Sequence, residues 1–245
     1  NGKLKQGGNY TAGEADGYFV DYYVNGEVME EGWYVGDKRE GTVISRNLFG
    51  QITSKVYYLD NNIHGITEYY FPNGLSDYKM YYDNGWFNRI EQFDSTGNLI
   101  SNSALDKGDG VILFKHFNGK PYVENNYKNY KQHGPYKILN GDGSKYCTGF
   151  YKNGEKDSLY TEWYPNGKLA AEGSYFNNSK TGTWKTYWNN GQLSSVEHYT
   201  DGKLEGKNFQ YNEDGSIDKE LNYDDGLPEG EFKTYADKQL ALVYY

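Results

Sequence analysis

The sequence is poor in the residues that build or cross-link an ordinary core. Its 245 residues include 1 cysteine, 2 methionines and 5 prolines, and the mean hydropathy is −0.94. Cys147 cannot form an internal disulfide by itself, so cysteine usage gives no information about the compartment. The aliphatic content is too low for a conventional spherical core. Any buried apolar surface must therefore come mostly from aromatic side chains.

An excess of positive charge and long apolar runs are also missing. Asp and Glu number 34 against 25 Lys and Arg, which gives a net charge of −9. A nucleic-acid binder needs a basic surface that displaces counterions, so we expect no nucleic-acid partner. The acidic balance also argues against docking on anionic lipid. No apolar run approaches the roughly 18–20 residues that span a bilayer, so we expect no membrane insertion.

The start of the chain shows no signal peptide. It begins at Asn1 without a methionine and already in the phase of the repeat described below. We therefore expect that an upstream segment was removed. This favours an extracytoplasmic location, secreted or surface-anchored after trimming of a signal, over a cytoplasmic one, and leaves the compartment itself open.

The residues that abound are glycine and tyrosine, at 31 and 28 copies. Much of the glycine falls in Asn-Gly or Asp-Gly steps whose spacings are 24, 48, 45, 24, 24, 24 and 24 residues. Such a period is the signature of a repeat array. The steps end at Gly2, Gly26, Gly74, Gly119, Gly143, Gly167, Gly191 and Gly215.

We number each 24-residue repeat from its first residue, usually a glycine, as offset 0. The turn glycine then falls at offset 9 and a tyrosine at offset 17. One repeat, Arg89–Asp109, is shortened to 21 residues. We treat residues 1–245 as a single repeat array. Repeats start at residues 17, 41, 65, 89, 110, 134, 158, 182, 206 and 230, and residues 1–16 are a partial repeat.

An Asn-Gly step between β-prone runs predicts a two-residue type I′ hairpin, because both central residues need a positive φ. This turn would set Tyr164 opposite Leu169, Tyr160 opposite Gly173 and Tyr199 opposite Gly182. Aromatic rings would then cover glycines, and the offset-0 glycine would be a packing partner of a tyrosine. We predict an all-β fold of tandem hairpin repeats, forming one elongated, twisted or curled antiparallel meander sheet with almost no helix.

Few residues suggest chemistry. The four histidines lie far apart and have no metal-ligand spacing. No catalytic or metal-binding residue and no cofactor is predicted, and Cys147 falls on the apolar face. The one candidate binding surface is a row of aromatics at offset 5, which could stack sugars or hold an extended peptide. The alternative is that these rings are a second packing ladder. They are Tyr22, Tyr70, Trp163, Tyr187, Tyr211 and Tyr235.

Residues 160–175 and 182–193 give the clearest form of the unit, Gly-x-Trp-x-x-Tyr-x-x-Asn-Gly-x-Leu followed by Tyr-x-Asn-Gly. This unit resembles the MORN repeat, most closely its bacterial variant. The resemblance implies a row of β-hairpins and no reaction. Related proteins act as scaffolds and interaction surfaces, and some bacterial relatives are antitoxin components.

Two functions follow as hypotheses. The first is a non-enzymatic scaffold for protein–protein interaction, of an antitoxin-like or surface-protein kind, whose partner is a protein and which can also self-associate. The alternative is a carbohydrate-binding module that uses the offset-5 aromatics to bind a glycan. An enzyme would need a catalytic domain outside these residues.

Overall fold

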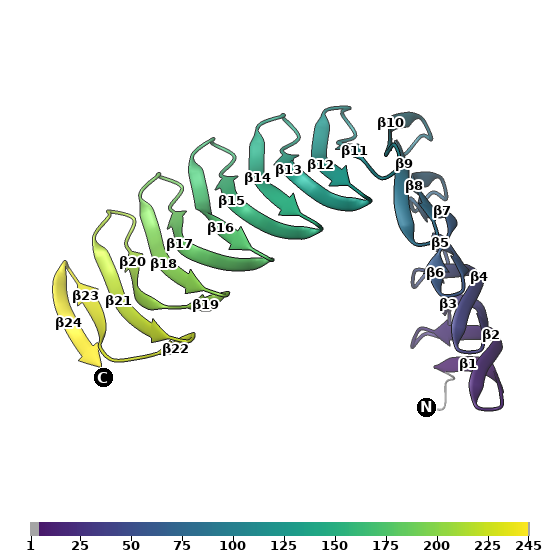
Figure 1. Ribbon diagram of the computed structural model, residues 1–245, viewed down its shortest axis with the longest axis horizontal. Coiled ribbons are helices and arrows are strands. Elements are labelled where there is room, and N and C mark those ends of the chain that lie inside the picture. Colours follow the sequence, from purple (N-terminus) through teal and green to yellow (C-terminus); the bar gives the residue numbers. More distant parts are fainter. Residues whose placement is uncertain (1–4, 245) are drawn as a thin grey trace. The chain divides into compact units, whose positions relative to one another are not determined.

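The computed structural model describes residues 5–244 and contains no helix among them. Within each of two sheets, the strands follow one another as antiparallel hairpins, and the longer strands pair with the next long strand along the chain (Figure 1). This confirms the predicted all-β fold of hairpin repeats. The first Asn-Gly step, Asn1-Gly2, lies outside the described residues.

The chain divides into two compact units, Asn1–Gly119 and Lys120–Tyr245. Within unit 1, β1 to β10 form one sheet, and within unit 2 the strands from β12 to β24 are joined in sequence. The single array over residues 1–245 stays a prediction.

Unit 1 contains β1 (Gln6–Thr11), β2 (Glu14–Tyr22), β3 (Val28–Val35), β4 (Lys38–Arg46), β5 (Ile52–Leu59), β6 (Asn62–Ile63), β7 (Gly65–Tyr70), β8 (Ser76–Asp83), β9 (Trp86–Phe93), β10 (Leu99–Ala104) and β11 (Gly110–Lys115). Unit 2 contains β12 (Pro121–Lys128), β13 (Lys131–Leu139), β14 (Lys145–Lys152), β15 (Glu155–Trp163), β16 (Leu169–Phe176), β17 (Ser179–Tyr187), β18 (Leu193–Thr200), β19 (Lys203–Leu204), β20 (Gly206–Tyr211), β21 (Ile217–Asp224), β22 (Leu227–Pro228), β23 (Phe232–Ala236) and β24 (Gln239–Tyr244).

The Asn-Gly turns differ from the predicted type I′ turn. In the best repeat the Gly167 amide donates to the Tyr164 carbonyl at 2.9 Å, and the Tyr164 amide donates to the Lys168 carbonyl at 2.8 Å. Gly167 has a φ of 80°, whereas Asn166 is not among the residues with positive φ. This is a type I turn closed by a left-handed glycine. Turns with two successive positive φ values occur instead between repeats, as at Asn153-Gly154.

This turn shifts the register of each hairpin by one residue. Trp163 pairs with Leu169, and Tyr187 pairs with Leu193. The predicted pairing of Tyr164 with Leu169 is therefore wrong. Beyond the shift the predicted register is confirmed, since Tyr160 pairs with Gly173 and Gly182 pairs with Tyr199.

One side of each sheet, which we call the core face, carries offsets 0, 2, 4, 13, 15 and 17. Its central position is offset 2, where Trp184 is 3% exposed and Ile112 is fully buried. A Cβ on Gly173, at offset 15, would lie 2.2 Å from the Trp184 ring. Glycine is thus required beneath an aromatic ring, although the ring over Gly173 comes from the following repeat. The buried side chains at offset 2 are Phe19, Val43, Thr67, Ile112, Tyr136, Trp184 and Asn208.

The glycine at offset 0 has a different cause from the predicted one. No heavy atom lies within 4 Å of the Cβ that Gly182 would carry, so no tyrosine ring excludes a side chain there. Its φ is +65°, in the left-handed region that favours glycine. Backbone conformation, rather than ring packing, therefore selects the residue.

The shortened repeat Arg89–Asp109 ends the first sheet at β10. At the joint between β10 and β11, side-chain hydrogen bonds replace the backbone ladder that connects the strands of each sheet. The Gln92 amide donates to the Lys115 carbonyl at 2.8 Å and accepts from the Lys115 amide at 2.9 Å. Ser101 and Ser103 hydroxyls bind the Leu113 carbonyl, and Ser103 also accepts from the Leu113 amide.

Candidate functional site

The opposite side of each sheet, which we call the open face, carries offsets 1, 3, 5, 11, 14 and 16. All six candidate aromatics at offset 5 lie on it and are half-buried. Trp163, Tyr187, Tyr211 and Tyr235 follow one another across unit 2, on β15, β17, β20 and β23. Tyr22 and Tyr70 occupy the same position on β2 and β7 of unit 1.

Hydrogen bonds fix several of these rings to carboxylates. The Tyr187 hydroxyl donates to Glu172 at 2.7 Å, the Tyr235 hydroxyl to Glu220 at 2.7 Å, and the Tyr70 hydroxyl to Glu68 at 2.6 Å. Burial, together with the bond to Glu172, raises the pKa of Tyr187 to about 12. These rings are held in place, and they present edges and faces rather than free hydroxyls to a ligand.

Lysine ammonium groups lie over two rings of the row. The Lys145 ammonium lies 5.2 Å from the Trp163 ring centre, and the Lys55 ammonium lies 5.6 Å from the Tyr70 ring centre. Such contacts are favourable electrostatically. The row therefore serves as a packing ladder as well as a candidate surface, and its role in binding stays a prediction.

Sequence reasoning missed the aliphatic half of this row. Because of the register shift, each aromatic of unit 2 lies directly opposite an aliphatic residue of the next strand. A type I turn would have been indicated by Pro165, whose fixed φ suits its second position. The aliphatic partners are Leu169, Leu193, Ile217 and Leu240.

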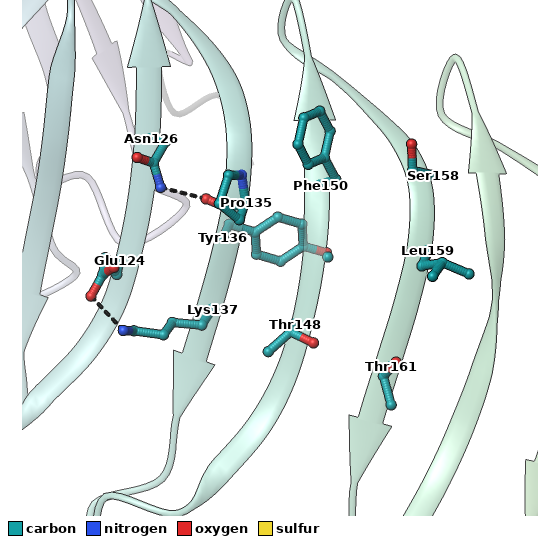
Figure 2. A pocket seen from close by; sticks show the side chains of 11 residues that line it. Glu124, Asn126, Pro135, Tyr136, Lys137, Thr148, Phe150, Ser158, Leu159 and Thr161 are labelled. Carbon is teal, nitrogen blue, oxygen red and sulfur yellow. Dashed lines mark hydrogen bonds and ion pairs between the residues drawn. The ribbon is translucent and has the colours of Figure 1, made fainter.

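A groove of about 620 Å³ opens on unit 2 across β13, β14 and β15 (Figure 2). Its apolar side chains are Pro135, Phe150 and Leu159, one from each strand. Leu159 is 73% exposed. Because Pro135, Phe150 and Leu159 line the same groove, they form a contiguous apolar wall, which is a candidate surface for a partner.

A bulge between repeats produces this exposure. Phe150 pairs with Asp157 and Thr148 pairs with Thr161, so Gly149 alone faces the three residues from Ser158 to Tyr160. Leu159, at offset 1, is the middle residue of this bulge. The offset-1 residue is exposed in every regular repeat, while offset 2 lies on the core face. This local geometry could not be foreseen from the 24-residue period.

The polar side of the groove is already satisfied internally. The Lys137 ammonium lies 2.7 Å from the Glu124 carboxylate, and the Asn126 amide donates to the Pro135 carbonyl at 2.6 Å (Figure 2). Thr148 and Thr161 are direct cross-strand partners. The groove thus combines an apolar wall with a neutral polar wall, which suits recognition of a polypeptide surface.

Reactive groups lie elsewhere and are engaged in structure. Cys147 is buried on the core face, and burial raises the pKa of its thiol. The Nδ1 atoms of His64 and His133 accept hydrogen bonds from the Asn84 and Asn153 amides. Among residues 5–244, no three His, Cys, Asp or Glu side chains are grouped as metal ligands, and no helix is long and apolar enough to cross a membrane.

Comparison with protein families gives a match within unit 2. The family model of the MORN repeat variant matches residues 156–177, 180–201 and 204–225, three consecutive copies of the hairpin unit. Residues 156–225 therefore consist of MORN-variant repeats. MORN repeats generally serve as interaction scaffolds rather than as enzymes. The matched copies lie in unit 2 and contain Trp163, Tyr187 and Tyr211.

Other comparisons add little to the MORN assignment. No curated protein matches the chain. Among solved structures, a chain from the crystal structure of TcdB2-TccC3-Cdc42 is similar at 10% identity and a TM-score of 0.19, and the match covers 91% of the present chain but 14% of the other. A likeness at this level carries no argument about fold or function.

Proposed function

We propose that this MORN-repeat protein is a non-enzymatic scaffold that binds a protein partner through the open face of unit 2. The observation that carries the proposal is the groove, where the exposed side chains of Pro135 and Leu159 and the half-buried ring of Phe150 form an apolar wall on three successive strands. The aromatic and aliphatic row from Trp163 to Tyr235 continues apolar surface along the same face. The antitoxin-like or surface-protein role and the sugar-binding alternative stay predictions.

Rigid hairpins explain how such a face would serve as a scaffold. Each repeat fixes the next through a backbone ladder, so the spacing of side chains on the open face is set by strand separation, about 4.8 Å per strand. A partner then meets a preorganised surface and pays little ordering entropy on the scaffold side.

The test is to map where a captured partner binds. We would capture proteins from the native source with the wild-type protein, identify and purify the main one, and measure its affinity by calorimetry. Leu159→Asp should weaken binding at least about tenfold, because it places a charge in the apolar wall. Phe176→Asp is the matched control, since Phe176 is 55% exposed but does not line the groove. Equal loss in both variants, or none in Leu159→Asp, would overturn the proposal.

A further inference from the structure

One line of side chains crosses the open face of unit 2 from β12 to β23. Each member is the direct cross-strand partner of the next. Its charges repeat every 48 residues, or every two repeats. The acidic members are Glu124, Glu172 and Glu220, and the basic members are Lys137, Lys185 and Lys233.

Neutral residues fill the intervening strands. Thr148 and Thr161 separate the first charged pair from the second, and Val196 and Phe209 separate the second from the third. In strand order the line therefore reads acidic, basic, neutral, neutral, and this unit of four strands recurs.

This order is complementary to its own reverse. When the line is read from β23 back to β12, every acidic position meets a basic one, every basic position an acidic one, and every neutral position a neutral one. A two-fold axis parallel to the strands, between β16 and β17, applies this reversal when one open face is laid on another. Glu172 then faces Lys185 of the second copy, and Glu124 faces Lys233.

The neutral positions are likewise set opposite neutral residues. The same axis sets Phe209 of the second copy over Thr148, within the groove of the first. Val196 of the second copy is set over Thr161, which also lines the groove. An aromatic side chain is thereby placed in the groove whose apolar wall otherwise faces water.

The central charged side chains remain partly exposed for such contacts. The Glu172 and Lys185 side chains are 41% and 45% exposed and lie 4.0 Å apart, and Glu172 Oε1 also accepts the Tyr187 hydroxyl at 2.7 Å. The outer pair of Glu124 and Lys137 is already closed internally at 2.7 Å, so the central pair contributes most to the contact. Ten strands span about 43 Å, and offsets 1 to 5 span about 14 Å. About 600 Å² on each copy, or about 1,200 Å² in total, reaches the lower end of stable interfaces.

We infer that the open face of unit 2 binds a second copy of the same chain, face to face, with the strand order reversed. This inference rests on the proposed function, because it names the partner of that same face. Its charge contacts are half-exposed, so the dimer weakens as ionic strength rises.

The experiment mixes two charge variants. Lys185→Glu leaves two acidic residues at the central pair, and Glu172→Lys leaves two basic ones. Each substitution acts twice across a two-fold axis, so each variant alone should dimerise at least about tenfold more weakly than wild type in sedimentation equilibrium. Mixed together, the two variants restore both contacts of the pair and should form a heterodimer with about wild-type affinity.

Control variants distinguish a loss of the interface from a loss of folding and from a general effect of net charge. Lys168→Glu changes the net charge equally but lies in a turn, where its ammonium binds the Asn190 carbonyl, and should dimerise as wild type does. Circular dichroism checks that each variant is folded. If either central variant fails to fold, Glu124→Lys and Lys233→Glu replace the pair.

Each result decides the inference. A wild-type protein that stays monomeric, or a dimer that is insensitive to both variants, or a mixture that does not associate, overturns it. A monomeric wild type leaves the open face as a binding surface for another protein, which the calorimetric comparison of Leu159→Asp and Phe176→Asp tests separately.

Discussion

Ser158 and Gly182 occupy the same position in successive repeats, with φ values of +62° and +65°. A left-handed conformation costs an L-residue about 1–2 kcal/mol relative to glycine's freedom to adopt it. Ser158 bears this cost beside the groove, where its hydroxyl donates to Asp157 at 2.7 Å.

Exchanging the two residue types should therefore change stability in opposite directions. We expect Ser158→Gly to raise the free energy of unfolding by about 0.5–1 kcal/mol and Gly182→Ser to lower it by about 1 kcal/mol. Urea denaturation followed by circular dichroism measures both. The same sign for the two variants would contradict a conformational origin of the offset-0 glycine.

Gly173→Ala tests the contact between glycine and the aromatic ring. The added Cβ would lie 2.2 Å from the Trp184 ring, so the ring or the backbone must move, and we expect a loss of about 2–3 kcal/mol. Gly167→Ala is the matched variant, because no heavy atom lies within 4 Å of its Cβ and its φ is +80°. Backbone strain alone predicts about 1 kcal/mol there. Equal losses in urea denaturation would argue against ring overlap as the dominant cost.

Replacing Thr67 by an apolar residue should stabilise the fold. Its side chain is 2% exposed, and its hydroxyl is buried without a hydrogen-bond partner, at a position where other repeats bury phenylalanine, valine or tryptophan. Thr67→Val removes this unpaired group at nearly constant volume and should stabilise the fold by about 1 kcal/mol. Thr186→Val is the control, since the Thr186 hydroxyl bonds Ser195 at 2.8 Å and its loss should destabilise. Thermal denaturation distinguishes the two signs.

Alkaline pH should destabilise the fold through its tyrosines. The pKa of Tyr187 rises from 10.0 to about 12 on folding, through burial and its bond to Glu172. Its contribution is complete below pH 10 and is lost as pH rises towards 12, because the unfolded chain ionises first. Urea midpoints measured from pH 9 to 12 should fall less steeply for Tyr187→Phe than for wild type. Parallel curves would show that this hydroxyl does not contribute.

The repeat phase, the antiparallel hairpins and much of the register could be predicted from sequence. The period of the Asn-Gly steps places Tyr160 opposite Gly173 without knowledge of the turn type, because an error of one residue is absorbed in the bulge before Trp163. That error hid the aliphatic partners of the aromatic row, of which Leu169 is one. The pattern of identical residues finds the repeat, whereas local backbone geometry decides which side chains meet at the turn.

The groove could not be predicted from the sequence, for a different reason. It depends on Gly149 facing three residues at once and on Leu159 standing outward at the middle of that bulge. Pairing rules for regular strands contain no such position. The charge order of the open face was present in the sequence, but it becomes a line only when the cross-strand partners are known.

At the joint between β10 and β11, side-chain hydrogen bonds contribute to whether the strands on its two sides unfold together. Everywhere else along the described hairpins, backbone atoms hold neighbouring strands together, and substitution cannot remove them. At this joint the amide of Gln92 and the hydroxyls of Ser101 and Ser103 hold β11. Three ordinary point mutations would therefore remove the polar contacts of this joint. The strength of the joint is thus a property that substitution can change, unlike a backbone ladder.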